Sequence, residues 1–380
     1  MAGKIPDFHY EWSPMSFRIP TVLALLLITL ILLPESPCRA AEADSLPQQI
    51  PANDPHLRYS GRFDFSDPKA PKCAWPASTV TLRFKGRAAE VEMEGKKGVA
   101  WQVSVDGKPA QVLTNDGSAQ VLSLAKDLPE GEHTIALVKR TEPLVGTASI
   151  TGFRLNEGAV LLQAEEPKRR MEVIGDSISA GFGNEAKDQH EKFTPETENA
   201  SIAYGALAAR ALGAEYVCIA WSGKKMWPDN TIPELYDRIL PLDPSSQWDF
   251  SKWTPDVVVI NLATNDFGPG NPEEEGWVKA YLDFIARVRK NYPKAYIFCA
   301  TSPMMADAYS KSKDARTTAT RYLNRVIDEC HKAGDARVAL VDLPAQTGAL
   351  GFGAAWHPSA RQHENSAEVL EKAIREKLGW

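Results

Sequence analysis

The sequence is poor in cysteine, with 5 residues in a chain of 380. The four cysteines that follow the first 43 residues match no zinc-binding pattern in their spacing. Cys218 and Cys299 lie inside apolar runs that resemble β-strands, and cysteines in such places are usually buried free thiols. We therefore expect no cysteine zinc site and interpret Cys218 and Cys299 as free thiols. The sequence leaves open whether disulfides form among the four residues Cys73, Cys218, Cys299 and Cys330.

Concentrated positive charge and metal-ligand clusters are also lacking. The chain has 43 Lys and Arg against 49 Asp and Glu, a net charge of −6, and no basic block. This composition argues against nucleic acid as a partner.

No cluster of His, Cys, Asp and Glu has the spacing of a catalytic zinc site. We therefore expect a function that needs no metal ion.

The chain has little that could span a membrane. The apolar run at residues 22–33 is interrupted only by Thr29 and preceded by Arg18. A run of this length is short for a membrane span and typical of a signal-peptide core. Small residues suited to cleavage follow at 38–40 and 41–43. We interpret residues 1–43 as a signal-peptide region, which predicts a secreted or periplasmic protein without stable membrane association; an uncleaved anchor is the alternative.

Residues 44–165 have the pattern of an all-β domain. Apolar and polar side chains alternate in short runs, and Asp106-Gly107 is a strong hairpin turn. Many short strands separated by turns predict a β-sandwich or jelly roll. No catalytic constellation appears here, and His133 on an alternating strand is interpreted as structural. The predicted strands are residues 79–84, 89–93, 101–105, 120–124, 133–139 and 148–155.

Residues 166–380 alternate strand-like runs with helical patterns. Five strands joined by crossover helices predict a parallel sheet between two helical layers, a flavodoxin-like three-layer α/β domain. The polar residues 184–199 are predicted to form a surface loop beside the sheet edge. The predicted strands are residues 171–174, 215–220, 256–262, 295–300 and 337–342. The predicted helices are residues 200–212, 273–290 and 315–333, and a final amphipathic helix with the stripe His363, Ala367, Leu370, Ile374 and Leu378.

Gly175-Asp176-Ser177 ends the first of these strands. The order predicts a strand, a sharp turn and a helix, which places Ser177 at the carboxyl end of a parallel strand, where open α/β sheets bind ligands. A helix N-terminus also offers free N–H groups to a negative charge. The motif is not the Gly-x-Ser-x-Gly elbow of the α/β-hydrolases, because a second serine stands where that pattern has its last glycine. We interpret Ser177 as a candidate nucleophile; a serine that only caps a helix is the alternative.

Three later segments are expected at the same edge of the sheet. Ser222-Gly223 follows the second predicted strand, Thr264-Asn265-Asp266 follows the third, and His357-Pro358 lies just before the final helix. Together with Ser177 they gather a hydroxyl, a backbone N–H, an amide and an imidazole. Acyl transfer uses this set: a serine attacks a carbonyl, a histidine accepts its proton, and N–H donors hold the oxyanion.

These four blocks resemble, in the same order, those of the SGNH (GDSL-like) hydrolases. The preceding β-domain and the run Trp356-His357-Pro358-Ser359 narrow the resemblance to carbohydrate esterase family 2, in which a jelly-roll domain precedes an SGNH domain. The resemblance covers nearly all of the chain after residue 43. It implies release of acetyl groups from plant polysaccharides such as xylan or mannan, without a metal or organic cofactor, so the expected partner is an acetylated polysaccharide or oligosaccharide.

The resemblance also implies a role for each site residue. Ser177 is the expected nucleophile, and His357 is the expected general base. The expected oxyanion hole consists of the N–H of Ser177, the N–H of Gly223 and the side-chain amide of Asn265.

The sequence departs from the SGNH pattern at one position. An aspartate often stands three residues before the histidine, and this chain has Ala354 there. The family tolerates this loss by using a backbone carbonyl to orient the imidazole, which implies a Ser–His dyad. Asp176 is expected to stabilise the turn rather than to act in catalysis. His363 is the competing histidine, but it falls inside the predicted final helix.

Trp356 and Trp221 flank two of the site positions. We interpret them as candidates for a surface that stacks on sugars, with packing in the core as the alternative.

Two other functions of the protein stay open. One is a glycan-binding protein without catalysis, against which the intact Ser177 and His357 argue; the other is a lipase or thioesterase acting on longer acyl chains. The sequence names neither the polysaccharide nor the position of the acetyl group.

Overall fold

The computed structural model describes residues 46–308, residue 311 and residues 313–380. The predicted signal-peptide region, residues 1–43, lies outside the described residues, so its interpretation stays a prediction. Within the described ranges, no helix combines the length and apolarity that a membrane crossing requires.

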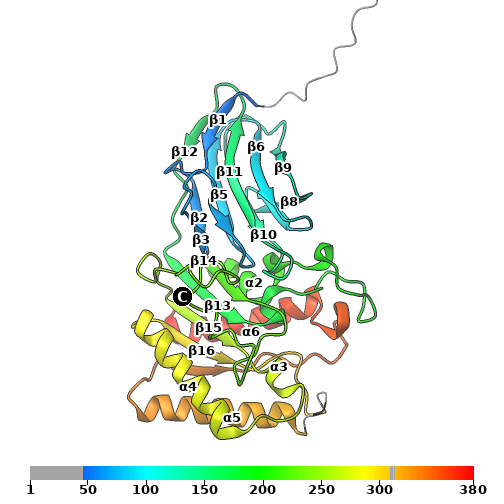
Figure 1. The fold of residues 1–380 in the computed structure, drawn as a ribbon, viewed down its shortest axis with the longest axis vertical. Helices are drawn as coiled ribbons and strands as arrows, with labels where there is room; N and C mark the ends of the chain where they lie inside the picture. Colours follow the sequence, from blue (N-terminus) through cyan, green and yellow to red (C-terminus); the bar gives the residue numbers. More distant parts are fainter. Residues whose placement is uncertain (1–45, 309–310, 312) are drawn as a thin grey trace, which may run out of the picture. The chain divides into compact units, whose positions relative to one another are not determined.

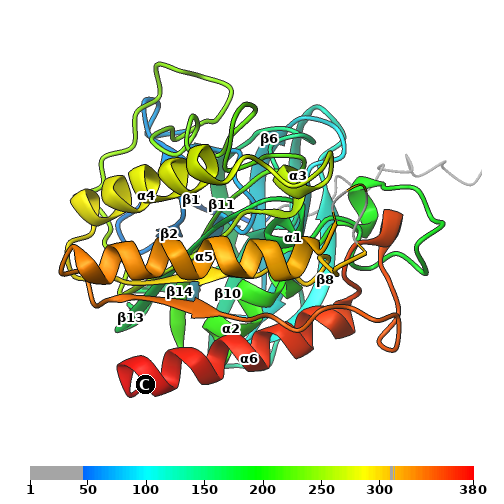
Figure 2. The same ribbon diagram turned by 90° about the horizontal axis from the view of Figure 1, so that it is seen from below.

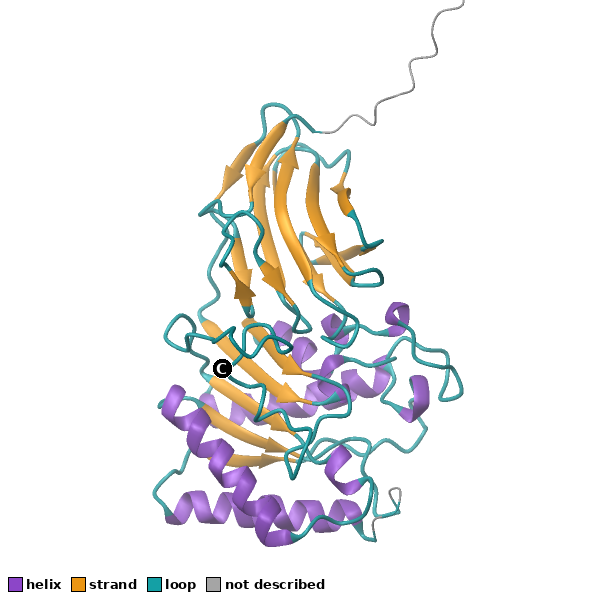
Figure 3. Cartoon of the chain, viewed as in Figure 1, coloured by secondary structure: helices purple, strands orange, loops and turns teal. Residues whose placement is uncertain are grey.

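The all-β domain is a sandwich of two six-stranded antiparallel sheets (Figure 3). One sheet has the order β3-β4-β11-β6-β9 with β1 beside β11, and the other has the order β12-β5-β10-β7-β8 with β2 beside β5. Val91 and Phe153 from the first sheet and Phe84 and Trp101 from the second share one buried core. The strands are β1 (Gln48–Pro51), β2 (Arg58–Ser60), β3 (Phe63–Asp64), β4 (Lys72–Cys73), β5 (Thr79–Lys85), β6 (Ala89–Gly95), β7 (Ala100–Val105), β8 (Lys108–Thr114), β9 (Ala119–Ala125), β10 (Glu132–Lys139), β11 (Ala148–Leu155) and β12 (Val160–Leu162).

Each strand predicted for this domain is present, and the predicted hairpin turn forms. Asp106 and Gly107 have φ values of +51° and +76°, as a type I′ turn requires. His133 has a structural contact, because its Nδ1 lies 2.8 Å from Asp106 Oδ2. The sequence does not predict β8, whose side chains are almost all exposed. This strand lies at a sheet edge, where a proline such as Pro109 is tolerated.

The α/β domain is built on a five-stranded parallel sheet with the order β14-β13-β15-β16-β17 (Figure 1). Counted along this domain the order is 2-1-3-4-5, the flavodoxin-like arrangement, in which ligands bind between the first and third strands. All five predicted strands are confirmed, with ends shifted by a few residues. They are β13 (Arg169–Gly175), β14 (Ala214–Ala220), β15 (Val257–Asn261), β16 (Tyr296–Ala300) and β17 (Val338–Val341).

Helices cover both faces of this sheet (Figure 2). Apolar side chains of α4 and α5 pack on one face, and those of α2 and α6 pack on the other. The predicted helix at residues 200–212 is interrupted: a 3-10 turn at Ala200–Ile202 precedes α2, because Ala203 is extended with ψ 153°. The helices are α1 (Ser177–Ala180), α2 (Tyr204–Ala211), α3 (Thr264–Phe267), α4 (Glu274–Asn291), α5 (Ala315–Lys332) and α6 (Ala360–Leu378).

A buried arginine of the sandwich domain enters the α/β domain. The Arg62 guanidinium lies over the rings of Tyr236, Trp248 and Phe250, at 4.9, 5.5 and 5.4 Å from their centroids. One of its nitrogens lies 3.6 Å from a carboxylate oxygen of Glu172 in β13, and both side chains are 1% exposed. This ion pair joins the two domains through the interior.

The four cysteines of the described chain are buried free thiols. They lie in separate elements of the two domains, in β4, β14, β16 and α5. The interpretation of Cys218 and Cys299 as buried free thiols is therefore confirmed, and the structure shows the same for Cys73 and Cys330.

Candidate active site

The first site element is the turn between β13 and α1. Asp176 is the N-cap of α1, and its Oδ1 accepts the Ile178 N–H at 3.0 Å. Ser177 follows as the first helical residue and is 5% exposed. The turn-stabilising role expected for Asp176 agrees with this contact, and burial raises its pKa to about 7. The prediction that Ser177 stands at a strand end and a helix N-terminus is confirmed.

Ser177 and His357 form a hydrogen-bonded pair across 180 residues of sequence. His357 Nε2 lies 2.9 Å from Ser177 Oγ, and Nδ1 of the same ring lies 3.0 Å from the Ala354 carbonyl oxygen. A carbonyl oxygen only accepts, so Nδ1 carries the hydrogen and Nε2 is free to accept the serine hydroxyl hydrogen. This tautomer is the one that a general base needs.

An unusual backbone brings the Ala354 carbonyl to the imidazole. Ala355 and Trp356 have φ values of +49° and +66°, a left-handed conformation that non-glycine residues rarely adopt. The segment is held in place because Ala354 N–H donates to the Gly183 carbonyl at 2.9 Å. Gly183 must be a glycine, since an added Cβ would lie 2.4 Å from Ala354 Cβ. The strained loop therefore fixes the partner of the imidazole.

The environment of His357 favours its neutral form. Burial lowers the pKa of His357 to about 4, while the nearby backbone carbonyls of Ala354 and Ala355 raise it by less. The Phe182 ring lies 4.4 Å from the imidazole and stacks on Phe193 at 4.1 Å. The imidazole thus has the Phe182 ring on one side, and the Ala354 carbonyl takes the place at Nδ1 that the carboxylate has in a triad.

The predicted oxyanion donors lie beside this pair. The N–H groups of Ser177 and Gly223 have no hydrogen-bond partner among the described residues. Asn265 lies in α3, directly after β15; its Nδ2 donates to the Lys224 carbonyl at 2.9 Å and lies 3.4 Å from Asp176 Oδ2. The structure therefore gathers the end of β13, the turn after β14 and the start of α3 at one edge of the sheet.

The competing histidine is not part of this group. His363 is buried in α6, and its Nδ1 accepts the Tyr204 N–H at 3.1 Å. The structure therefore supports the choice of His357.

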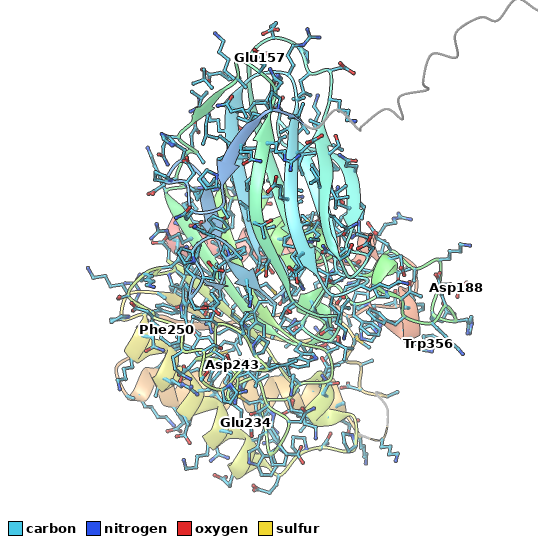
Figure 4. All side chains as sticks on the ribbon, turned by 45° about the horizontal axis from the view of Figure 1, so that its top comes forward. Glu157, Asp188, Glu234, Asp243, Phe250 and Trp356 are labelled. Carbon is cyan, nitrogen blue, oxygen red and sulfur yellow. The ribbon has the colours of Figure 1, made fainter. Side chains whose placement is uncertain are left out.

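The two tryptophans differ in their surroundings. Trp356 is 53% exposed, and Figure 4 shows it on the same side of the molecule as Asp188. Its ring lies 5.1 Å from Phe352 and 6.1 Å from His190. Trp221 packs against the apolar core of the α/β domain, with Lys224 Nζ 4.9 Å from its ring. The packing alternative is favoured for Trp221, whereas Trp356 is available to a ligand.

Two buried carboxylates near the site have roles that the sequence does not indicate. Asp266 accepts the Met226 and Trp227 N–H groups at 3.1 and 2.9 Å, and its place next to Asn265 could have suggested a supporting role. Glu142 accepts the Ser222 N–H at 2.5 Å. Glu142 belongs to the sandwich domain, and nothing in the sequence links it to the site.

No group of three or more His, Cys, Asp and Glu side chains in the described parts of the chain could hold a metal ion. Independence from metal stays a prediction that chelation can test.

Both domains match known families. Residues 59–164 match the family described as Carbohydrate esterase 2 N-terminal, and residues 173–365 match the GDSL-like Lipase/Acylhydrolase family. The parallel sheet and its serine–histidine pair thus define the class of GDSL-like acyl hydrolases.

Individual relatives narrow this class. A family two carbohydrate esterase from Clostridium thermocellum, solved with cellohexaose, has a TM-score of 0.81 at 39% identity, covering 85% of this chain and 99% of that one. Cellulase/esterase CelE of Acetivibrio thermocellus is 39% identical over 339 residues, or 87% of this chain. The match spans 41% of the length of that relative. An acetylxylan esterase / glucomannan deacetylase of Cellvibrio japonicus is 25% identical over 340 residues, 87% of this chain and 91% of that protein. The chain belongs to carbohydrate esterase family 2.

Proposed function

We propose that this chain is a carbohydrate acetylesterase that removes O-acetyl groups from plant polysaccharides of the xylan or mannan type. The observation that carries the proposal is the row of contacts from the Ala354 carbonyl through His357 to Ser177 Oγ, at 3.0 and 2.9 Å. The names of the relatives support the substrate: one is an acetylxylan esterase / glucomannan deacetylase, and another was solved with cellohexaose.

In the proposed first step Ser177 attacks the acetyl carbonyl carbon. Its hydroxyl proton moves to His357 Nε2, and the carbonyl oxygen becomes an oxyanion held by the N–H groups of Ser177 and Gly223 and the amide of Asn265. The bond between the acetyl carbon and the sugar oxygen then breaks. The sugar hydroxyl leaves with the proton from His357, and the acetyl group remains on Ser177.

In the proposed second step a water molecule takes the place of the sugar. His357 accepts a proton from the water as its oxygen attacks the acetyl carbon of the acyl-enzyme. The bond to Ser177 Oγ breaks, the proton returns to the serine, and acetate leaves. Throughout both steps, the Ala354 carbonyl holds Nδ1–H and keeps Nε2 aimed at the reacting atoms.

Trp356 is proposed as a sugar contact at the rim of the site. Its ring is half exposed and held edge-on by Phe352, which suits stacking on a sugar face. Trp356→Ala should raise KM for an acetylated polymer several-fold and leave kcat/KM for a small acetyl ester nearly unchanged. Equal losses on both substrates would contradict a polymer contact.

The test of the proposed function is acetate release from a panel of acetylated xylan, glucomannan and simple acetyl esters. Ser177→Ala should abolish release in a folded protein. His357→Ala should do the same, whereas His363→Asn should retain turnover, because the asparagine oxygen can accept the Tyr204 N–H in place of Nδ1. Wild-type protein that binds these glycans without turnover would favour a non-catalytic glycan-binding protein.

The acyl chain is tested with nitrophenyl esters of increasing length. An acetylesterase should lose kcat/KM steeply beyond short acyl groups. A rate that stays constant or rises with chain length would favour a lipase or thioesterase.

Export is also proposed, supported by the sequence of residues 1–43 alone. The expected N-terminus of the protein recovered from the medium or periplasm lies near Ala40 or Ala43. Recovery of the uncleaved chain in membranes would favour an anchor.

A further inference from the structure

A carboxylate of the sandwich domain holds the turn that carries Gly223. Glu142 lies in the connection between β10 and β11 and is fully buried. Its Oε2 accepts the Ser222 N–H at 2.5 Å, across 80 residues of sequence. Ser222 is the residue immediately before Gly223, so Glu142 contacts the oxyanion-hole turn directly.

The turn itself is a tight four-residue structure. Lys224 N–H donates to the Trp221 carbonyl at 3.3 Å, which closes the turn around Ser222 and Gly223. Gly223 has φ +77°, as position i+2 of a type II turn requires. In such a turn, a rotation of the peptide between its two central residues would point the Gly223 N–H elsewhere.

Two carbonyls of the turn are held from the α/β domain. Asn230 Nδ2 donates to the Gly223 carbonyl at 3.0 Å, and Asn265 Nδ2 donates to the Lys224 carbonyl at 2.9 Å. Among the described residues, Glu142 is the acceptor for the Ser222 N–H. The orientation of Gly223 therefore depends on both domains.

Buried charged side chains hold the backbone at Glu142. Its backbone N–H donates to Glu198 Oε2 at 3.2 Å, and the buried Lys139 ammonium donates to the carbonyls of Ala74 and Thr141 at 2.9 and 2.6 Å. Burial raises the pKa of Glu142, while the hydrogen bond from Ser222 and the charge of Lys139 lower it. The second carboxylate oxygen, Oε1, has no hydrogen-bond partner among the described residues, so the bond from the Ser222 N–H is the contact that ties this side chain to the turn.

We propose that Glu142 is a positioning residue of the esterase: it holds the Ser222–Gly223 peptide so that the Gly223 N–H faces the oxyanion. The proposal rests on the proposed function. It gives the sandwich domain a part in catalysis beyond packing, because this domain supplies one of the contacts that shape the oxyanion hole.

The test compares kcat and KM of three Glu142 variants on a small acetyl ester. Glu142→Ala should lower kcat about 10- to 100-fold with KM nearly unchanged, since a shift of about 1 Å in a catalytic donor has effects of this size. Glu142→Asp keeps the carboxyl group but withdraws it by one methylene, so kcat should again fall. Glu142→Gln should recover kcat to within about threefold, because its amide oxygen still accepts the Ser222 N–H, although a neutral acceptor is weaker than a charged one.

Glu215 offers a matched control at the other end of β14. This carboxylate is also buried, accepts a hydrogen bond from Trp253 Nε1 at 2.8 Å and pairs with Arg58 of the sandwich domain at 3.5 Å. Glu215→Ala should lower the Tm through the loss of these contacts and leave kcat unchanged. A kcat that falls equally in Glu215→Ala and Glu142→Ala would overturn the positioning role, because general weakening of the domain contact would then explain both.

Two results separate this inference from the proposed function. Folded Glu142→Asp with wild-type kcat would refute the positioning role while Ser177→Ala still abolished turnover. Absence of esterase activity in the wild-type protein would instead refute the proposed function. If Glu142→Ala does not fold, the comparison of Glu142→Asp with Glu142→Gln decides the matter.

Discussion

Lowering the pH protonates His357 and removes the base, so the acidic limb of the kcat/KM profile should follow the titration of this imidazole. Its partner is the Ala354 carbonyl at 3.0 Å, which offers a dipole and no full charge. Burial disfavours the imidazolium and lowers the pKa of His357 to about 4. The base is competent when it is neutral. Activity should therefore be present above about pH 4 and disappear as the pH falls through that value.

The difference from an ordinary histidine is large at mildly acidic pH. At pH 5 a base with a pKa of about 4 is about 90% neutral, whereas one at the reference value of about 6.5 would be about 3% neutral. We therefore expect most of the plateau activity at pH 5, where a histidine of ordinary pKa would have lost nearly all of it.

The assay is kcat/KM for a small acetyl ester from about pH 3.5 to about pH 8, a range that brackets both values, with circular dichroism at each pH to confirm folding. Burial also raises the pKa of Asp176 to about 7 and that of Asp266 to about 6, so shallower inflections near these two values belong to the carboxyls. Asp176→Asn should remove the one near pH 7 and leave the acidic one of His357. A single inflection at or above about pH 6.5 in folded enzyme would refute the account of His357.

Three further predictions follow from the site and the domain contact. Asn265→Ala should lower kcat about 100- to 1,000-fold with little change in KM, as loss of one oxyanion donor does; a change confined to KM would indicate substrate binding instead. Dialysis against EDTA should leave kcat unchanged, and a loss that added metal reverses would contradict a metal-independent mechanism. Arg62→Ala should destabilise the fold by about 3–5 kcal/mol in a denaturant titration, because it leaves the buried Glu172 carboxylate without its counter-ion. Partial recovery in Arg62→Ala/Glu172→Gln would confirm the cause, and a wild-type midpoint would contradict it.

The elements of the α/β domain could be predicted because their signals are local. The strands that end at Gly175, Ala220 and Asn261 are mostly apolar, as expected of parallel strands buried on both faces, although Glu172 and Glu215 interrupt the first two. A parallel sheet brings the carboxyl ends of its strands to one edge, so the polar residues after each strand were expected together. The order of the sheet then placed Ser177 and Asn265 on either side of its switch point.

The contacts between the domains carry no such local signal. Glu142 meets Ser222 across 80 residues, and Arg62 meets the Tyr236 carbonyl across 174. Neither residue lies in a motif or interrupts a periodic pattern. A buried charge is recognised only when its partner and its surroundings are known, which requires the folded structure. The left-handed conformation of Ala355 and Trp356 is equally hidden, because neither residue type favours positive φ.

This strained loop also explains why the aspartate of a triad cannot simply be restored at position 354. Ala354 is fully buried, and its Cβ faces Gly183 so closely that a Cβ added there would lie 2.4 Å away. A carboxylate built on this Cβ would push the loop away from Gly183. The hydrogen bond that the Ala354 N–H donates to the Gly183 carbonyl would then break. The carboxylate would also need to be desolvated, at a cost that raises its own pKa. The carbonyl of the same residue already reaches Nδ1, so the loop orients the imidazole without adding a charge that would raise its pKa.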